Sequence, residues 1–274
     1  SKVELPALLP GREWGESSVD GLTVPVAQGP TGPIDITFGD AMPHGLITGS
    51  SGSGKSNLIK LLIYGLSARY SPDELELYLL DMKEGVTLAP MAPPNAGSGT
   101  YLPHARIIGL QADQEFGVSV LQEIERLYKR RMAEMSPVDN IKDYRRKYPD
   151  ARMPRVLVII DEFHMLLADD ANRVGKEAAK RLLSLVKLVR AAGIHILVAT
   201  QEIGFSALAG MRQGLLDQMK LRLALQNTPE ASQQTLRSGN TAAAELRFSP
   251  SDAFRPVVVN RELGAEQANQ VGRT

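Results

Sequence analysis

The chain has 274 residues, which is enough for one large α/β domain or for one domain with a small appendage. Its 31 basic and 31 acidic residues cancel, so the composition gives no global basic field for nucleic acid or membranes, although a local patch or a ring of subunits can still bind a polyanion. The chain has no cysteine and no apolar run near the roughly 20 residues of a membrane span, which excludes a disulfide scaffold, a thiolate metal site and a spanning helix.

Residues 1–42 are rich in proline and glycine, with short alternating stretches at 22–26 and 34–38. We therefore predict a short β-rich N-terminal lead-in that packs on a main domain formed by residues 43–274. From Gly45 onward, apolar strands alternate with helical segments, which is typical of an α/β fold with a mainly parallel sheet flanked by helices. Strands are predicted at residues 46–48, 75–80, 106–109, 156–160, 195–199, 220–225 and 256–259.

Three segments show apolar residues at helical spacing: 55–69, 113–135 and 176–192. We interpret each apolar stripe, including Phe116 on the second, as a face packed on the core. Residues 136–154 show no such pattern and are predicted to form a loop. The basic residues of this loop are interpreted as solvated surface: Lys142, Arg145, Arg146 and Lys147.

The strongest chemical signal is the segment LITGSSGSGKSNLIKLL at residues 46–62, which matches G-x-x-x-x-G-K-[ST] between an apolar strand and an amphipathic helix. Its glycines let backbone N–H groups wrap around a phosphate, and the helix N-terminus favours an anion. Lys55 is predicted to reach the β- and γ-phosphates of ATP, and the Ser56 hydroxyl to ligate Mg²⁺. A chance Gly/Ser loop is the alternative, and the flanking strand and helix argue against it. The predicted nucleotide contacts are Gly49, Ser50, Ser51, Gly52, Ser53, Gly54, Lys55, Ser56 and Asn57.

Two acids end the aliphatic segment RVLVIIDE at residues 155–162. Buried carboxylates need a partner, and ligand sites in open α/β sheets lie at the carboxyl ends of the strands. We predict that Asp161 holds Mg²⁺ and that Glu162 polarises the attacking water. Such runs are common, and the phosphate loop upstream is what favours this interpretation.

A further strand ends in Thr200 and Gln201. A polar residue there can contact the γ-phosphate or the lytic water, so Gln201 is a candidate sensor, with an ordinary strand end as the alternative. Asp81 is another strand-end acid with a weaker claim. His164 and His195 have no metal-ligand neighbours at useful spacing and are interpreted as structural.

Several motifs occur together in order around the phosphate loop. They are Met42-Pro43-His44-Gly45, LLDMKEG (79–85), LPHARIIG (102–109), VIIDEF (158–163), VRAAGIHILVATQ (189–201) and KLRLALQ (220–226). Over about residues 20–260, the chain resembles the motor domain of the FtsK/SpoIIIE branch of the HerA–FtsK ATPases.

This resemblance implies a RecA-like P-loop fold, assembly into a homo-hexameric ring, and ATP hydrolysis at subunit interfaces that drives a polymer through the central pore. Double-stranded DNA is our first hypothesis for this polymer. The lack of cysteine fits a reducing cytosol, so we expect a cytoplasmic domain, with any membrane anchor in a longer parent chain. The resemblance also implies that Arg190, in the stretch R-A-A-G-I-H, acts in trans as an arginine finger on a neighbouring subunit's nucleotide. Without the resemblance, Arg190 would be interpreted as a cation that complements a helix dipole.

Two departures from the family pattern leave the cargo open. DNA-pumping members usually continue A-T-Q with Arg-Pro, whereas this chain has Glu202-Ile203. The stretch DMKEG at 81–85 is similar to the D-[FL]-K-G-G form of the type VII secretion (EccC) ATPases. A secreted protein substrate is therefore the alternative to DNA. A third alternative, a scaffold that does not hydrolyse ATP, is disfavoured by the presence of Lys55, Asp161 and Glu162. Lys83 and Arg212 are candidate pore residues, or plain surface charges.

Overall fold

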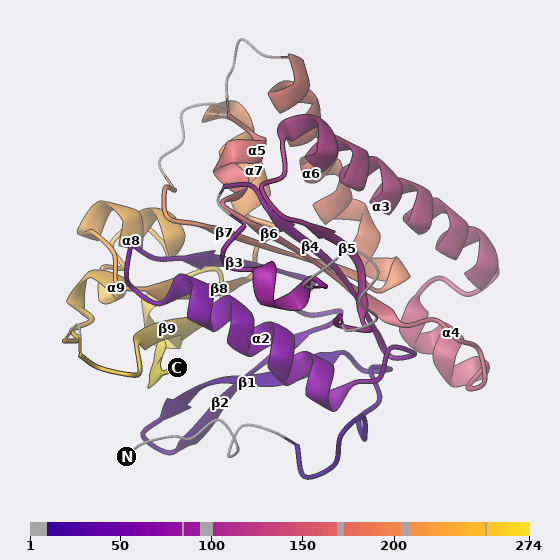
Figure 1. Ribbon diagram of the computed structural model, residues 1–274, viewed down its shortest axis with the longest axis horizontal. Helices are drawn as coiled ribbons and strands as arrows, with labels where there is room; N and C mark the ends of the chain where they lie inside the picture. Colours follow the sequence, from indigo (N-terminus) through magenta and orange to yellow (C-terminus); the bar gives the residue numbers. More distant parts are fainter. Residues whose placement is uncertain (1–9, 84, 94–100, 169–172, 204–208, 250) are drawn as a thin grey trace.

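One mixed sheet organises the molecule, with its strands in the order β2-β1-β10-β9-β8-β3-β7-β6-β4-β5 (Figure 1). The computed structural model describes residues 10–83, 85–93, 101–168, 173–203, 209–249 and 251–274. The strands are β1 (Leu22–Gly29), β2 (Gly32–Phe38), β3 (His44–Thr48), β4 (Leu75–Asp81), β5 (Ala105–Gly109), β6 (Arg155–Asp161), β7 (Ile194–Thr200), β8 (Leu221–Leu225), β9 (Pro256–Asn260) and β10 (Gln270–Arg273). The helices are α2 (Lys55–Arg69), α3 (Gln114–Met135), α4 (Ile141–Lys147), α5 (Phe163–Leu166), α6 (Arg173–Leu188), α7 (Ala209–Leu216), α8 (Pro229–Thr235) and α9 (Ala242–Glu245), with 3₁₀ turns η1 (Ala89–Met91), η2 (Val189–Ala192) and η3 (Glu266–Ala268).

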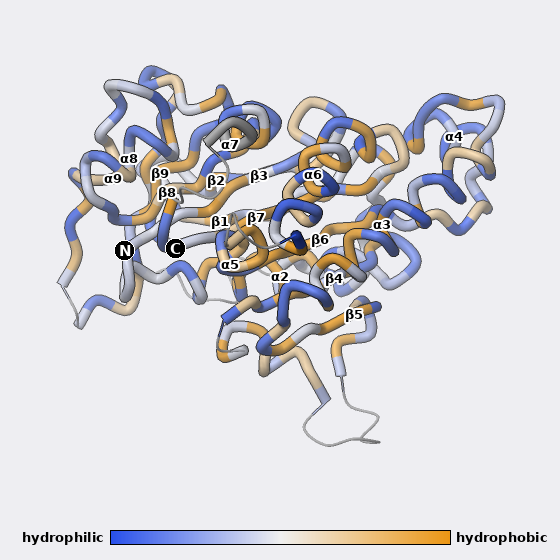
Figure 2. The backbone as a smooth tube through the Cα atoms, turned by 90° about the horizontal axis from the view of Figure 1, so that it is seen from above, coloured by the Kyte–Doolittle hydropathy of each residue, from blue (hydrophilic) through white to orange (hydrophobic). Residues whose placement is uncertain are grey.

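The half of the sheet from β8 to β5 is parallel, as the sequence predicts. Its strands are apolar throughout because both faces are covered. Along β6, Val156 and Ile160 pack in the cluster that includes α3 and α6, whereas Leu157 and Ile159 pack in the cluster that includes α2. Figure 2 shows these apolar strands running between more polar helices. The α/β fold with a mainly parallel sheet is therefore confirmed.

The other half of the sheet, from β9 to β2, is antiparallel. The sequence places residues 256–259 among the parallel strands, and this is wrong because β9 pairs antiparallel with β8. A parallel pair needs a crossover that returns the chain to the opposite end of the sheet. In the described residues between β8 and β9, the only helices are the short α8 and α9, which pack against these same two strands. The chain therefore enters β9 at the end where β8 stops.

The N-terminal lead-in adds the strands β1 and β2 to the edge of the same sheet. β1 and β2 form a hairpin, and β1 pairs with β10 at Gln28 and Arg273. Side chains of the hairpin, among them Leu22 and Phe38, are buried in the cluster that includes α2. β10 is absent from the sequence prediction because only one of its four residues is buried, so it has no apolar alternation to detect.

The segment predicted as loop at 136–154 contains the helix α4. Asn140 caps α4, because its Oδ1 accepts a hydrogen bond of 2.9 Å from the Asp143 backbone N–H. Arg145 on α4 is buried and not solvated, because its guanidinium donates to Ser18 Oγ and to Glu74 Oε1, each at 2.7 Å. The interpretation of this arginine as surface charge is therefore wrong.

The three predicted helices are present, with differences at their ends. α2 matches the predicted bounds, whereas the third helix ends at Leu188 and continues as the turn η2 up to Gly193, which has a φ of 69°. Phe116 is 40% exposed, because it lies in the first turn of α3 and covers Gly109 instead of the core. Within the described part of the chain, no helix is long and apolar enough to cross a membrane.

Candidate active site

The phosphate-loop motif forms the turn between β3 and α2, at the carboxyl edge of the parallel strands. Gly54 has a φ of 100° in the left-handed region, and a Cβ there would lie 2.6 Å from Arg255 Cγ. A Cβ on Gly49 would lie 2.4 Å from Ser53 Oγ. Position 54 therefore requires glycine because of its backbone conformation and because a side chain would clash. Position 49 requires glycine because there is no space for a side chain. The backbone N–H and the hydroxyl of Ser50 both donate to Gln226 O, each at 2.9 Å, which ties the loop to the end of β8.

The loop offers the donors that a polyphosphate needs. Ser53 Oγ is buried and has no hydrogen-bond partner among the described residues. Lys55 begins α2, a helix of 15 residues whose N-terminal N–H groups point toward the loop. Ser56 Oγ accepts a 3.0 Å hydrogen bond from Thr87 Oγ1. An unpartnered buried hydroxyl, backbone amides and a lysine at one helix N-terminus fit a nucleotide phosphate chain.

Lys55, Asp161 and Glu162 meet in one buried ion cluster. The Lys55 ammonium forms an ion pair with Asp161 Oδ1 and lies 2.9 Å from Glu162 Oε1, with the lysine side chain only 4% exposed. The three residues come from α2 and from the end of β6, which are 106 positions apart in sequence. One cation shared by two carboxylates leaves a net negative charge at the end of β6, which suits a magnesium ion beside Asp161 and the Ser56 hydroxyl.

Glu162 adopts a backbone conformation that is rare for a residue with a side chain. Its φ of 52° and ψ of 45° place it in the left-handed region, between β6 and α5. Such conformations cost on the order of 1 kcal/mol or more and concentrate at functional sites. The turn brings Glu162 Oε2 within 3.1 Å of the donating Gln201 backbone N–H and within 3.3 Å of His164 Nδ1. Gln201 therefore reaches the ion cluster through its backbone, and the sensor role of its side chain stays a prediction.

Arg190 lies at the other edge of the sheet. It belongs to η2, immediately before β7, and its guanidinium donates to Asp40 O at 3.4 Å. β7 runs parallel to β3, so its seven residues separate Arg190 from the phosphate-loop edge by about 20 Å. Within one chain, the exposed Arg190 cannot contact the cluster around Lys55.

Two buried histidines lie near this amino edge. The Ile196 backbone N–H donates to His44 Nδ1 at 3.0 Å, and burial lowers the pKa of His44 to about 4, with the charge of Arg190 adding to the effect. His195 Nδ1 lies 2.9 Å from Pro43 O, and His195 Nε2 lies 3.2 Å from Arg155 Nη1. Burial, followed by the charge of Arg155, holds the pKa of His195 well below its ordinary value. Both imidazoles are therefore neutral structural groups.

The structure adds contacts that the sequence does not predict. Thr87 binds Ser56, and no motif marks it. His164 is at the site because α5 turns it back toward Glu162 and Thr200. The sequence signal for this placement is its position two residues after Glu162. Asp81 pairs in register with Asp161 and accepts a 3.0 Å hydrogen bond from the backbone of Lys83. The side chain of Arg212 lies outside the described residues.

Comparisons with known proteins identify related chains. The model of the FtsK/SpoIIIE family matches residues 9–205. The DNA translocase FtsK of Chlorobaculum tepidum is 31% identical over 201 residues, covering 70% of this chain and 24% of that protein. The ESX secretion system protein EccC of Geobacillus thermodenitrificans is 27% identical over 216 residues, covering 73% of this chain and 13% of that protein. The chain thus spans a quarter or less of the length of these two relatives.

Solved structures share the fold. The cytoplasmic domain of the Thermomonospora curvata type VII secretion ATPase EccC aligns with a TM-score of 0.73 at 23% identity, covering 100% of this chain and 30% of that one. The pCW3 conjugation coupling protein TcpA, in a monomer form with ATPγS, aligns with a TM-score of 0.70 at 20% identity, covering 99% of this chain and 70% of that one.

Proposed function

Since this chain belongs to the FtsK/SpoIIIE family of P-loop ATPases, we propose that it is the motor domain of a ring-forming translocase that moves double-stranded DNA. ATP is hydrolysed at sites shared between neighbouring copies of the domain, in an assembly that is a homo-hexamer when active. The observation that carries the proposal is the buried cluster of Lys55, Asp161 and Glu162 beside the phosphate loop.

Each residue of the cluster has a role in hydrolysis. Backbone N–H groups of residues 49–56 and the Ser53 hydroxyl hold the phosphate chain, and Lys55 exchanges its carboxylate partners for the β- and γ-phosphate oxygens. Glu162 orients the attacking water and accepts its proton. Ser56 and Asp161 would hold Mg²⁺, which, when bound, neutralises charge on the phosphate oxygens. Gln201 lies next to Glu162 and reports whether the γ-phosphate is present.

Arg190 supports the sharing of sites. Its distance from Lys55 along β7 rules out a contact within one copy, while its exposure leaves it available to another copy. A guanidinium beside the γ-phosphate stabilises the charge that develops during transfer. We therefore assign Arg190 to the nucleotide of the neighbouring subunit.

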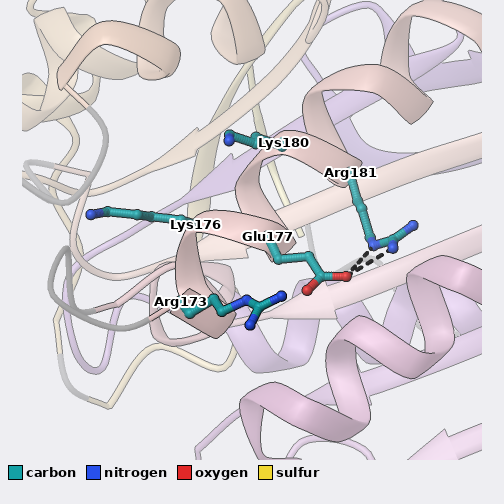
Figure 3. Close-up of a pocket in the computed structure, with 5 residues that line it drawn as sticks. All are labelled: Arg173, Lys176, Glu177, Lys180 and Arg181. Carbon is teal, nitrogen blue, oxygen red and sulfur yellow. Dashed lines mark hydrogen bonds and ion pairs between the residues drawn. The ribbon is translucent and has the colours of Figure 1, made fainter.

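Exposed cations on α6 favour DNA as the cargo. Figure 3 shows Lys176 and Lys180 pointing away from the Glu177–Arg181 ion pair, with Arg173 one turn earlier on the helix. Glu177, which lies between these lysines in the sequence, is paired with Arg181, and Arg181 also binds Glu125 on α3. Two exposed lysines about one helical turn apart suit the regular negative charge of a phosphodiester backbone, in contacts that weaken steeply with salt.

A protein substrate is the second candidate. It is favoured by the stretch DMKEG at 81–85 and by the similarity to EccC, which is named as a secretion protein. The two cargoes make different demands on the surface of α6, since a peptide does not require a row of cations.

The deciding experiment is the steady-state ATPase rate at several protein concentrations, with and without long double-stranded DNA, at low and moderate salt. A rate per copy that rises with concentration, and rises again with DNA, is expected for a DNA motor with shared sites. The double variant Lys176→Glu with Lys180→Glu should lose the DNA stimulation and keep the basal rate, while Lys129→Glu on α3 is the matched control. A rate indifferent to DNA but raised by secreted-substrate peptides would establish the second candidate instead.

A further inference from the structure

We infer that His164 is a positioning residue that holds the carboxylate of Glu162 and links it to the end of β7. The inference rests on the proposed role of Glu162 as the base in hydrolysis. His164 lies on α5, two residues after Glu162, and its side chain is only 12% exposed.

The contacts of His164 connect two elements of the site. Its Nδ1 lies 2.9 Å from Thr200 Oγ1, at the last residue of β7, and 3.3 Å from Glu162 Oε2. The same carboxylate oxygen accepts the 3.1 Å hydrogen bond from the Gln201 backbone N–H. Glu162 is thus held from α5 and from β7 at once.

The surrounding groups determine where the proton of the imidazole lies. A carboxylate can only accept hydrogen bonds, so an approach of 3.3 Å is favourable only if Nδ1 is a donor. The Thr200 hydroxyl donates to Glu202 O at 2.9 Å and accepts from the Glu202 backbone N–H at 3.0 Å. It is therefore free to accept from Nδ1 as well. The carboxylate therefore favours the tautomer with the proton on Nδ1, and the Thr200 hydroxyl can accept from the same N–H.

This arrangement gives the two oxygens of Glu162 different roles. Oε2 is fixed by His164 and by the Gln201 N–H, whereas Oε1 faces Lys55. When Lys55 turns to the phosphates, Oε1 is the oxygen left to receive the proton of the attacking water. His164 itself touches neither the water nor the phosphates. Its effect is to keep the base in one orientation, which is what proximity catalysis requires of a general base.

Three substitutions at one position separate positioning from packing. In His164→Asn, the side-chain amide N–H lies close to the place of Nδ1. In His164→Gln, the amide reaches the place of Nε2, and His164→Ala has no donor. We expect His164→Asn to keep kcat within about 3-fold of wild type, and the other two to lose roughly 10- to 100-fold, the range for losing one hydrogen bond to a charged group. KM for ATP and the Kd of a fluorescent ATP analogue should stay unchanged in all three.

A second measurement does not depend on turnover. The tautomer of His164 can be read by NMR on protein labelled with ¹⁵N-histidine, at about pH 8.5, where an ordinary imidazole is neutral. The chain has four histidines, and His164→Asn identifies the signal by its loss. A proton on Nδ1 is expected. A proton on Nε2, or a kcat of wild-type size in both His164→Ala and His164→Gln, would overturn the inference.

Glu162→Gln, measured in parallel, separates this inference from the function on which it rests. We expect Glu162→Gln to bind ATP with normal affinity and to hydrolyse it roughly 10²- to 10⁴-fold more slowly. Normal turnover in Glu162→Gln would refute the role of Glu162 as base. Slow turnover in Glu162→Gln combined with normal turnover in His164→Ala would refute the role of His164 alone.

Discussion

At the scale of single residues, Lys55 is a buried cation with two carboxylate partners. It is therefore their counterion, in addition to its proposed role as a ligand of the phosphates. Its removal has two effects for this reason. The phosphates lose a charge, and Asp161 and Glu162 are left facing each other without a cation, which repels the incoming anion.

We therefore expect Lys55→Ala to weaken ATP binding by at least about 100-fold, as measured by titration with a fluorescent ATP analogue. Lys60→Ala is the matched control, since Lys60 lies on the same helix and is only partly buried. Circular dichroism should confirm that both variants are folded. Wild-type affinity in folded Lys55→Ala would refute the assignment of the phosphate loop.

The sequence predicts Lys55, Asp161 and Glu162 because fixed spacing and strand ends mark them. It does not predict Thr87 or the approach of His164 to Thr200, because these contacts depend on how η1 and α5 turn back toward the site. The left-handed conformation of Glu162 is equally invisible in sequence, since nothing in the residue type requires it.

At the scale of elements, α4 shows how one helix is fixed by a buried charge. Arg145 binds Ser18 in the lead-in and Glu74 just before β4, whereas its neighbour Arg146 forms an exposed pair with Asp20. Two adjacent arginines on one helix thus differ in burial and in partners.

Arg145→Ala should lower the free energy of unfolding by about 2 kcal/mol, because it leaves the partly buried Glu74 without its cation. Arg146→Ala should change it by less than about 0.5 kcal/mol, as is usual for exposed pairs. Urea unfolding of the two variants measures the difference. Equal effects would show that the burial of Arg145 does not matter to stability.

The strands were the easiest elements to predict, because burial on both faces makes them continuous apolar runs. The direction of β9 was not predictable, since an apolar run reads the same in either direction. The apolar pattern does not reveal α4, because seven residues give less than two turns of periodicity. The only sequence signal for this helix is the cap formed by Asn140 and Asp143.

At the scale of the whole molecule, the buried histidines make stability depend on pH. The pKa of His44 is about 4 in the folded chain, below the ordinary value near 6.5, so the unfolded chain takes up a proton first as the pH falls. The stability that this group contributes is present above about pH 6.5 and is lost as the pH falls from there toward 4. The lowered pKa of His195 acts in the same direction.

Between about pH 6.5 and pH 5, His44 alone should lower the free energy of unfolding by about 2 kcal/mol. The measurement is urea unfolding at both pH values. In His44→Asn, the side-chain carbonyl can still accept from the Ile196 N–H, but the group no longer titrates, so the decline should be smaller by about that amount. An identical decline in both proteins would place the titrating groups elsewhere.

Arg190 and Lys55 can be tested together by mixing. Arg190→Ala should bind ATP normally and lose at least about 10³-fold in turnover, the lower range for arginine fingers. Lys55→Ala should also be inactive. A mixture of the two variants should regain activity, because a Lys55→Ala copy can offer Arg190 to an Arg190→Ala neighbour whose phosphate loop is intact. Failure of the mixture to regain activity would count against an action in trans.

Lys55 and Arg190 lie at opposite edges of the sheet, and this placement determines how many complete nucleotide sites an assembly can have. In the proposed assembly, each copy offers one incomplete nucleotide site at one edge of its sheet and one completing arginine at the other, so copies would join head to tail. In an open row of n copies, the last nucleotide site has no arginine and the first arginine has no site, which leaves n − 1 complete pairs. Only a closed ring completes all n nucleotide sites. The ratio of active sites to copies of the chain therefore distinguishes a ring from an open row without an image of the assembly.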